Sequence, residues 1–368
     1  MWTYILVIAG LIFVTVALYM IRGLSRIEFM QHICKDKKWL SVILSIVGFA
    51  VVFTVFVLWL DYINTILIFI HLCVFWMLVD FIMFIRKRIT GKEAKRWMAT
   101  LVAFSISTVY ILTGVYHAYN VDETTYQVKT DKNVGDIRVV LLADAHIGAL
   151  FDGDGFEKHV DRIQKANPDV VIIAGDFVDD DSKREDVEKC CKALGKLECK
   201  YGVYYSPGNH DRGYYSYRDF TYNDLKIEFE KNGINVLEDE CVLIDDRFYI
   251  LGRKDKSEFA IGSERKSMEE MVSGLDESKY MIVVDHQPND YKAEYESGVD
   301  LVLSGHTHGG QLFPGAYTGE WTGLNELSYG MENIKDTYFV VTSGIADWRL
   351  KFKTGCKSEY VIVDVKEE

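Results

Sequence analysis

Two histidines one residue apart, His306 and His308, lie in a glycine-rich stretch whose side chains could bind a metal ion. They follow the apolar run 299–303, which is typical of a buried strand. Alternate side chains of an extended segment point to opposite sides, so both rings reach one centre only if the backbone bends sharply. The flanking glycines permit such a bend and let the backbone approach a ligand closely. Alone, the stretch is equally compatible with a polar turn that carries two surface histidines.

Four other apolar runs end in the same kinds of side chain. These are Asp144 and His146 after 137–142, Asp176 after 170–174, Asn209 and His210 after 202–205, and His286 after 280–284. Ligands of open α/β sheets gather outside the carboxyl ends of the strands. Taken singly, Asp176 could be a helix cap and Asn209 a turn residue. Five such endings together predict one shared site.

Seven of these side chains are candidate metal ligands: Asp144, His146, Asp176, Asn209, His286, His306 and His308. They offer carboxylate, amide and imidazole atoms and no thiolate. Such a set suits Mn²⁺, Fe or Zn²⁺ better than Ca²⁺ or Mg²⁺, and we expect Mn²⁺ first. Seven ligands are too many for one tetrahedral ion and fit two ions that share a bridging carboxylate. Two ions about 3.5–4 Å apart clamp a phosphoryl group and activate a water as hydroxide.

At these positions the sequence resembles the calcineurin-like metallophosphoesterases. Five ordered blocks carry the resemblance, over about residues 137–365: Asp144-x-His146, Gly175-Asp176, Gly208-Asn209-His210-Asp211, His286, and Gly305-His306-x-His308. The runs Gly309-Gly310-Gln311 and His286-Gln287-Pro288 further resemble the membrane-associated bacterial branch of that family. Some members of this branch have membrane spans ahead of the catalytic domain.

The resemblance implies a role for each motif residue. The first ion would be held by Asp144, His146, Asp176 and His308. The second would be held by Asp176, Asn209, His286 and His306, with Asp176 bridging. His210 would stabilise the transferring phosphoryl group or protonate the leaving oxygen, and Asp211 would orient His210. The implied reaction is attack of a dimetal-bound hydroxide on a phosphodiester or phosphomonoester.

Strands that alternate with helices predict an α/β layered fold for the second part of the chain. The expected strands are 137–142, 170–174, 202–205, 248–251, 280–284, 299–303, 338–342 and 360–365, and the expected helices are 156–165, 184–197 and 224–231. The resemblance implies that these elements form two mixed β-sheets in a sandwich, flanked by helices.

The first part of the chain reads as a membrane region, because a span takes about 20 apolar residues. Four runs are long enough: 2–21, 40–60, 63–85 and 98–119. We therefore expect a transmembrane region over 1–119, a linker over 120–136 and the metallophosphoesterase domain over 137–368.

The links between the runs predict an orientation. The first link carries five Lys/Arg and the third carries six, whereas the second carries none. Basic links stay cytoplasmic. The sequence therefore predicts a multi-pass protein of the cell membrane, with both termini and the catalytic domain on the extracytoplasmic side.

The net charges of the two parts of the chain limit which ligands can be expected. Residues 1–119 have a net charge of +6 and residues 120–368 of −19. A nucleic-acid ligand is therefore not expected, because phosphate backbones are bound by clustered Lys/Arg. The seven cysteines include no CxxC pair, so we expect free thiols, with one bridge that involves Cys199 left open.

The substrate is left open by the sequence, as are the preference for monoesters or diesters, the metal and the oligomeric state. Aromatic residues such as Phe313, Tyr317 and Trp321 follow the histidine pair and favour a lipid-linked or envelope phosphoester. The alternative is that they only pack the loop. Two other functions remain open. One is a cytoplasmic-facing phosphohydrolase, and the other is a membrane metal-binding sensor or scaffold that binds a phosphorylated ligand without turnover.

Overall fold

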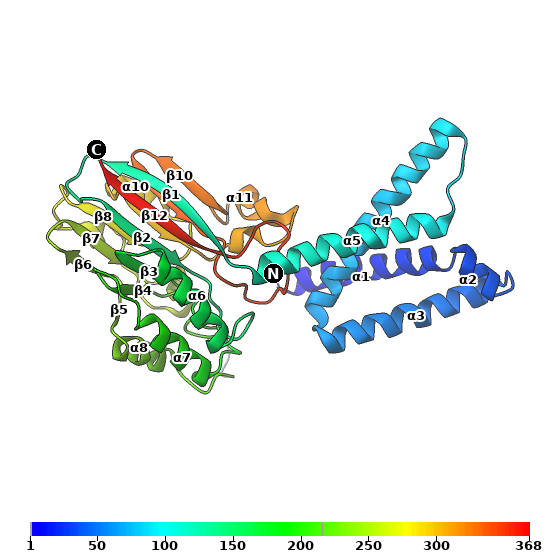
Figure 1. Cartoon of the computed structure of the whole chain (residues 1–368), viewed down its shortest axis with the longest axis horizontal. Helices are drawn as coiled ribbons and strands as arrows, with labels where there is room; N and C mark the ends of the chain where they lie inside the picture. The colour runs from blue at the N-terminus through cyan, green and yellow to red at the C-terminus, as the bar shows by residue number, and fades with distance from the viewer. Residues whose placement is uncertain (1, 215–216) are drawn as a thin grey trace. The chain divides into compact units, whose positions relative to one another are not determined.

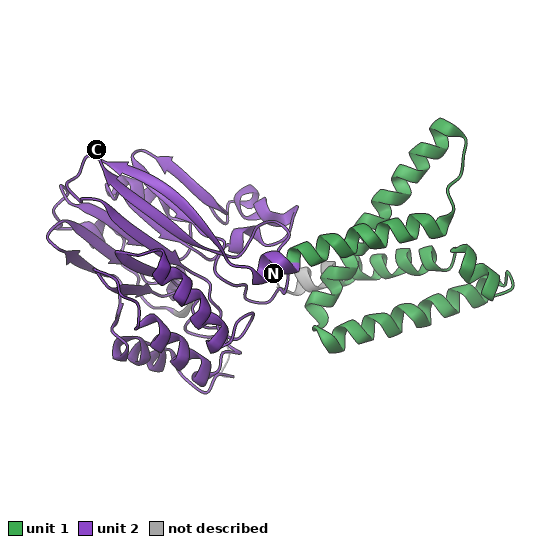
Figure 2. Ribbon diagram, in the orientation of Figure 1, with its two compact units in different colours: residues 1–114 green, residues 115–368 purple. Residues whose placement is uncertain are grey.

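The computed structural model describes residues 2–214 and 217–368, and the side chains of residues 2–9, 260 and 261 lie outside the described part. The chain divides into two compact units, Met1–Gly114 and Val115–Glu368 (Figure 2). Helix α5 (Arg96–Tyr119) begins in the first unit, and its last residues belong to the second. The expected boundary after residue 119 lies at the end of this helix.

The first unit is helical (Figure 1). It contains α1 (Trp2–Leu24), α2 (Glu28–Ile33), α3 (Lys38–Trp59), α4 (Tyr62–Thr90) and most of α5. Among the described residues, α3, α4 and α5 are long and apolar enough to cross a membrane. The part of α1 with described side chains, Gly10–Leu24, is apolar but shorter than a span. The expected span 2–21 falls partly outside the described side chains and stays a prediction.

The second unit is built on two six-stranded sheets. The first has the order β1-β12-β2-β3-β4-β5, formed by Asp122–Thr130, Glu359–Glu367, Ile137–Leu142, Val170–Ala174, Val203–Ser206 and Ile234–Val236. The second has the order β10-β11-β9-β8-β7-β6, formed by Gly330–Ile334, Thr337–Val341, Leu301–Ser304, Tyr280–Val284, Phe248–Gly252 and Glu240–Ile244. Each sheet contains parallel and antiparallel pairs, so the expected two mixed sheets are confirmed.

Both faces of the central strands are buried, which explains why the sequence shows continuous apolar runs rather than alternation. In β2, Val139 and Leu141 pack into the core between the two sheets. Val140 and Leu142 point the other way, toward a second core under the helices. The strand β2 therefore contributes alternate side chains to two separate hydrophobic cores.

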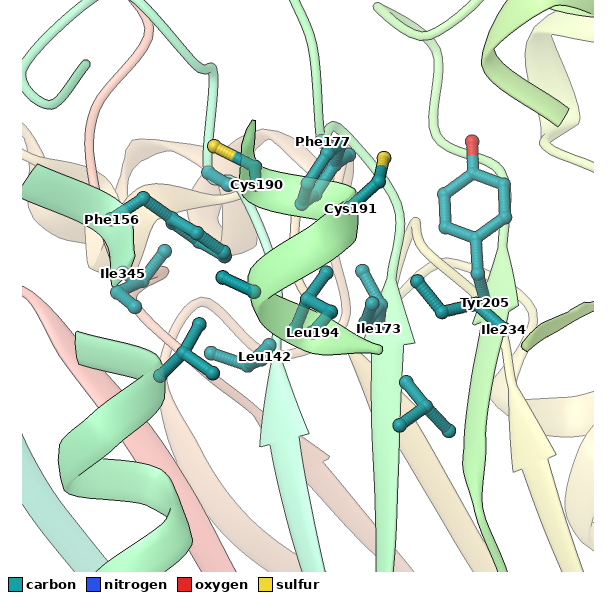
Figure 3. Packing of buried hydrophobic residues seen from close by; sticks show 14 of the residues in the cluster. Leu142, Phe156, Ile173, Phe177, Cys190, Cys191, Leu194, Tyr205, Ile234 and Ile345 are labelled. Atoms are coloured by element: carbon teal, nitrogen blue, oxygen red, sulfur yellow. The ribbon is translucent and has the colours of Figure 1, made fainter. Parts of the chain in front are cut away.

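Helices α6 (Gly153–Lys165), α7 (Arg184–Leu194) and α8 (Tyr222–Lys231) cover the outer face of the first sheet. Figure 3 shows the apolar side of α7 packed over the strands, with Cys190, Cys191 and Leu194 near Leu142 and Ile173. Both cysteines are buried free thiols, and all seven cysteines are free in the structure.

The outer face of the second sheet packs against two short helices, α9 (Met268–Val272) and α10 (Tyr291–Glu296), and η1 (Lys256–Ile261) precedes α9 in the chain. Three further short elements follow β9: η2 (His308–Gly310), η3 (Gly315–Tyr317) and α11 (Thr318–Thr322). The loop after the histidine pair is therefore partly helical.

The linker expected over 120–136 is wrong in one respect, because most of it is strand β1. This strand pairs in parallel with β12 over nine residues, from Asp122↔Glu359 to Thr130↔Glu367. Its side chains alternate between exposed and partly buried, as in an edge strand with one face in water. Polar residues on that face made the segment read as a linker.

Candidate metal centre

The structure brings the ends of five strands together, and the predicted site residues lie there. Asp144 and His146 follow β2, Asp176 follows β3, Asn209 and His210 follow β4, and His286 and His306 follow β8 and β9. The first three strands belong to one sheet and the last two to the other. The centre therefore lies across the carboxyl ends of both sheets, as the alignment of parallel strands dictates.

The backbone bends sharply at these site residues themselves, and not at Gly305, the glycine before the histidine pair. Left-handed φ angles occur at Asp144 (55°), His146 (37°), Asp176 (50°), His306 (71°) and His308 (49°). Non-glycine residues rarely adopt this region, and it costs free energy of the order of 1 kcal/mol or more at each. Such strain concentrates at ligand-binding sites, where it aims neighbouring side chains at one centre.

The predicted ligands form two groups, and the two histidines of the pair belong to different groups; a third cluster of possible ligand atoms, His146, Asp179 and His210, adjoins the first. In each group the ligand atoms lie within 4.8 Å of one another: Asp144, His146 and His308 in one, and Asp176, His286 and His306 in the other. His146 Nε2 lies 3.8 Å from Asp176 Oδ2, and His286 Nε2 lies 3.1 Å from the same oxygen. Asp176 is thus placed between the groups, where a bridging carboxylate is expected.

The side chains fit a pair of metal ions. Both ring nitrogens of His146 are buried without a hydrogen-bond partner. Asn209 Oδ1 is also buried and unpartnered, while its Nδ2 donates to Tyr214 Oη at 2.8 Å. Buried polar atoms are normally paired, so this many open lone pairs around one centre are explained by ligation.

Electrostatics favour the same reading. Burial lowers the pKa of His146 and of His306 to about 4, so both rings are neutral at neutral pH and can donate a lone pair. Burial also lowers the pKa of His286, but the carboxylates of Asp176 and Asp144 outweigh it and raise that pKa well above its usual value. These two carboxylates therefore favour a positive charge beside His286, which a bound cation would supply.

His210 lies beside the first group, and a carboxylate that the sequence reasoning missed holds it. Its Nδ1 lies 3.1 Å from Asp179 Oδ1, and its ring centroid lies 4.9 Å from that of His146. Burial alone would lower the pKa of His210, but the bond to Asp179 and the charge of Asp176 raise it to about 8. His210 is placed to carry a proton. The sequence signal for Asp179 was its position three residues after Asp176.

The expected role of Asp211 is wrong: this carboxylate orients backbone and not His210. It is fully buried, and Oδ2 accepts from the backbone N–H of Asp176 and Gly208, both at 2.8 Å. Oδ1 accepts from Phe177 N at 2.8 Å and Val178 N at 3.1 Å. Asp211 thus fixes the turns that carry Asp176 and Asn209, because backbone N–H groups at sharp turns need acceptors that the ladder does not supply.

A second missed group lies behind His308. Asp347 is fully buried, its Oδ1 lies 3.9 Å from His308 Nδ1, and it accepts from Gln311 Nε2 at 2.7 Å. Burial raises the pKa of Asp347 to about 7. Gln311 belongs to the motif run Gly309-Gly310-Gln311, and nothing in the sequence near Asp347 marks it as part of the site.

A cavity of about 370 Å³ opens next to the centre. It is lined by His306, His308, Gln311 and Trp348 and by residues of the η3–α11 segment. The walls leave room for a phosphoester next to both histidines of the pair.

Comparison with known proteins agrees with this geometry. Residues 137–310 match the family model of the calcineurin-like phosphoesterases. An uncharacterized metallophosphoesterase of Campylobacter jejuni is 28% identical over 312 residues, which cover 80% of this chain and 78% of the relative. One from Helicobacter pylori is 31% identical over 194 residues, 51% of this chain and 48% of the relative.

A transmembrane protein with a metallophosphoesterase domain from Danio rerio is 27% identical over 286 residues, 73% of this chain and 63% of that protein. The aligned part thus spans about half to three quarters of these relatives' length. Together with the apolar helices of the first unit, this relative indicates membrane association. The second unit of this chain therefore carries a domain of the calcineurin-like phosphoesterase family.

Proposed function

We propose that this protein is a membrane-anchored, metal-dependent phosphoester hydrolase. The observation that carries the proposal is the pair of ligand groups with Asp176 between them, together with the buried imidazole and amide atoms there that have no hydrogen-bond partner. When bound, two divalent ions would bind the phosphoryl oxygens and lower the pKa of the attacking water. Mn²⁺ is the proposed metal, with Fe or Zn²⁺ as alternatives, because the donor set mixes oxygen and imidazole.

The residues of the chain have distinct tasks in this proposal. Asp144, His146 and His308 would hold one ion, and His286 and His306 would hold the other with Asn209. Asp176 would belong to both. His210 would donate a proton to the leaving oxygen, with Asp179 keeping its Nδ1 fixed.

The membrane arrangement is also a proposal. The basic first and third links and the uncharged second link support four spans with both termini and the catalytic domain outside the cytoplasm. Protease accessibility of the second unit in intact cells tests this. Protection of the whole unit would contradict it.

The test of the activity uses purified full-length protein, Mn²⁺ and p-nitrophenyl phosphoesters, a diester and the matching monoester. We expect metal-dependent release of p-nitrophenol, and its loss in Asp176→Asn and in His308→Ala with reduced metal content. Full activity of either variant after metal depletion would refute the two-metal proposal. Metal binding without turnover of any ester would favour the sensor or scaffold.

A further inference from the structure

The cavity beside the metal centre is bordered by residues 312–325, which we call the rim segment. Four of its side chains are large, apolar and exposed: Phe313 (59%), Tyr317 (52%), Trp321 (74%) and Leu324 (70%). Exposed apolar groups that gather in one place on a folded domain mark a surface that binds a partner or a membrane. Trp and Tyr are also the residues enriched at the level of lipid headgroups.

The rim segment is built against the histidine pair. Leu324 lines the cavity opposite His306 and His308. Gly310 has a φ of +71°, and a Cβ there would lie 2.1 Å from Ala316 O, so the two backbones are in direct contact. The exposed side chains are therefore fixed at the entrance of the site.

The end of the last membrane helix is tied to the same place through the segment 354–358. Thr354 N and Gly355 N both donate to Gln311 O at 2.9 Å, at the start of the rim segment. Four residues later, Ser358 N donates to His117 O at 2.9 Å and Ser358 Oγ to Ala118 O at 2.8 Å. Four residues span at most about 14 Å, so the entrance lies close to the end of α5 within the second unit.

A basic stretch of the chain, residues 348–358, is also consistent with a membrane-facing surface near the rim segment. Residues 348–358 hold four basic residues and no acidic one, in a part of the chain whose net charge is −19. Arg349 and Lys351 are partly exposed, Lys357 is exposed, and Lys353 is buried; Arg349 lies 3.7 Å from Asp181 and Lys357 lies 2.8 Å from Asp122. Basic residues close to a bilayer are attracted to anionic lipids.

We propose that the rim segment inserts into the interface of the bilayer that anchors the chain, and that the site takes the headgroup phosphoester of an anionic membrane lipid. This inference rests on the proposed function and specifies its substrate class. In the reaction, the oxygen of a water forms a bond to phosphorus, the ester P–O bond breaks, and the leaving oxygen takes up a proton. Apolar rim side chains and basic neighbours are the usual composition of an interfacial binding surface.

The test compares one leaving group in two settings, using the full chain in nanodiscs with Mn²⁺. One substrate is the p-nitrophenyl ester of phosphocholine in water, and the other is phosphatidyl-p-nitrophenol in the nanodisc bilayer. For the double variant Phe313→Ser and Trp321→Ser, we expect hydrolysis of the bilayer ester to fall at least about tenfold, since interfacial binding scales with the apolar area inserted. Hydrolysis of the soluble ester should stay within about twofold, because neither side chain lines the cavity.

The matched control is Ile227→Ser, which removes an exposed apolar side chain (53%) from α8. It should leave both rates unchanged. A second readout is the quenching of Trp321 fluorescence by brominated lipids, taken as the difference between the wild type and Trp321→Phe. We expect strong quenching.

The outcomes separate the two proposals. If wild-type protein hydrolyses neither ester, the proposed function falls and this inference falls with it. If it hydrolyses the soluble ester but not the bilayer ester, or if the rim variant lowers both rates equally, the interfacial site is refuted while the hydrolase remains. Absence of Trp321 quenching would also refute insertion.

Discussion

A single methyl group at Gly305 should damage the metal centre by crowding the carboxylate of Asp144. Gly305 is the residue before His306, and its φ is not in the left-handed region, so alanine is conformationally allowed there. A Cβ at this position would lie 2.5 Å from Ala143 Cβ and 2.5 Å from Asp144 Oδ2. The glycine therefore permits close approach and not a special φ angle.

The size of the effect follows from that geometry. Ordinary Cβ contacts begin near 3.4 Å, so β2 or the carboxylate of Asp144 must move by about 0.9 Å. Ala143 Cβ is fixed to its backbone, and both oxygens of Asp144 accept from His306 N at 3.0 Å. Overpacking in a rigid place costs about 1–3 kcal/mol. The lower entropy of unfolded alanine offsets about 0.4–1 kcal/mol of this.

The assay measures metal content, turnover and urea unfolding of Gly305→Ala. We expect a lower unfolding midpoint, loss of the ion held by Asp144, and a fall in kcat/KM of about 100-fold, as for a shift of about 1 Å in other sites. The control is Gly48→Ala on α3, because a Cβ at Gly48 has no neighbour within 4 Å. Wild-type metal content and turnover in Gly305→Ala would refute the geometry described for the strand ends.

Two further predictions test the roles of the carboxylates around His210. The variant Asp179→Asn should lower kcat. Because Asp179 acts through His210, the double variant Asp179→Asn/His210→Ala should lose no more activity than His210→Ala alone. Additive losses in this double-mutant cycle would contradict the assigned role. Asp211→Asn should destabilise the second unit by about 2–6 kcal/mol in urea unfolding, since an amide nitrogen would face two of its four buried N–H donors. The exposed carboxylate of Asp246 supplies the control, Asp246→Asn, and equal stability of the two variants would show that Asp211 does not fix the turns.

Sequence reasoning located the strands of the two sheets where burial on both faces leaves a continuous apolar run. The strands β3 and β8 lie where expected, at 170–174 and 280–284. It did not find β1, because an edge strand with polar residues on its solvent face has no such run. It also missed β5, β6 and β10, which are short or partly exposed and lie near the sheet edges.

The candidate ligands themselves were determined by the sequence, because side-chain type and position after an apolar run are local properties. His306 and His308 could be named from their own stretch. The family resemblance implied which ligand joins which group, but only the tertiary structure brings the members of a group together, since Asp144 and His308 meet from strands of different sheets. The same holds for Asp179, Asp347 and the true partners of Asp211. Their roles depend on distances between loops far apart in the chain, which packing of the two sheets sets and local sequence does not encode.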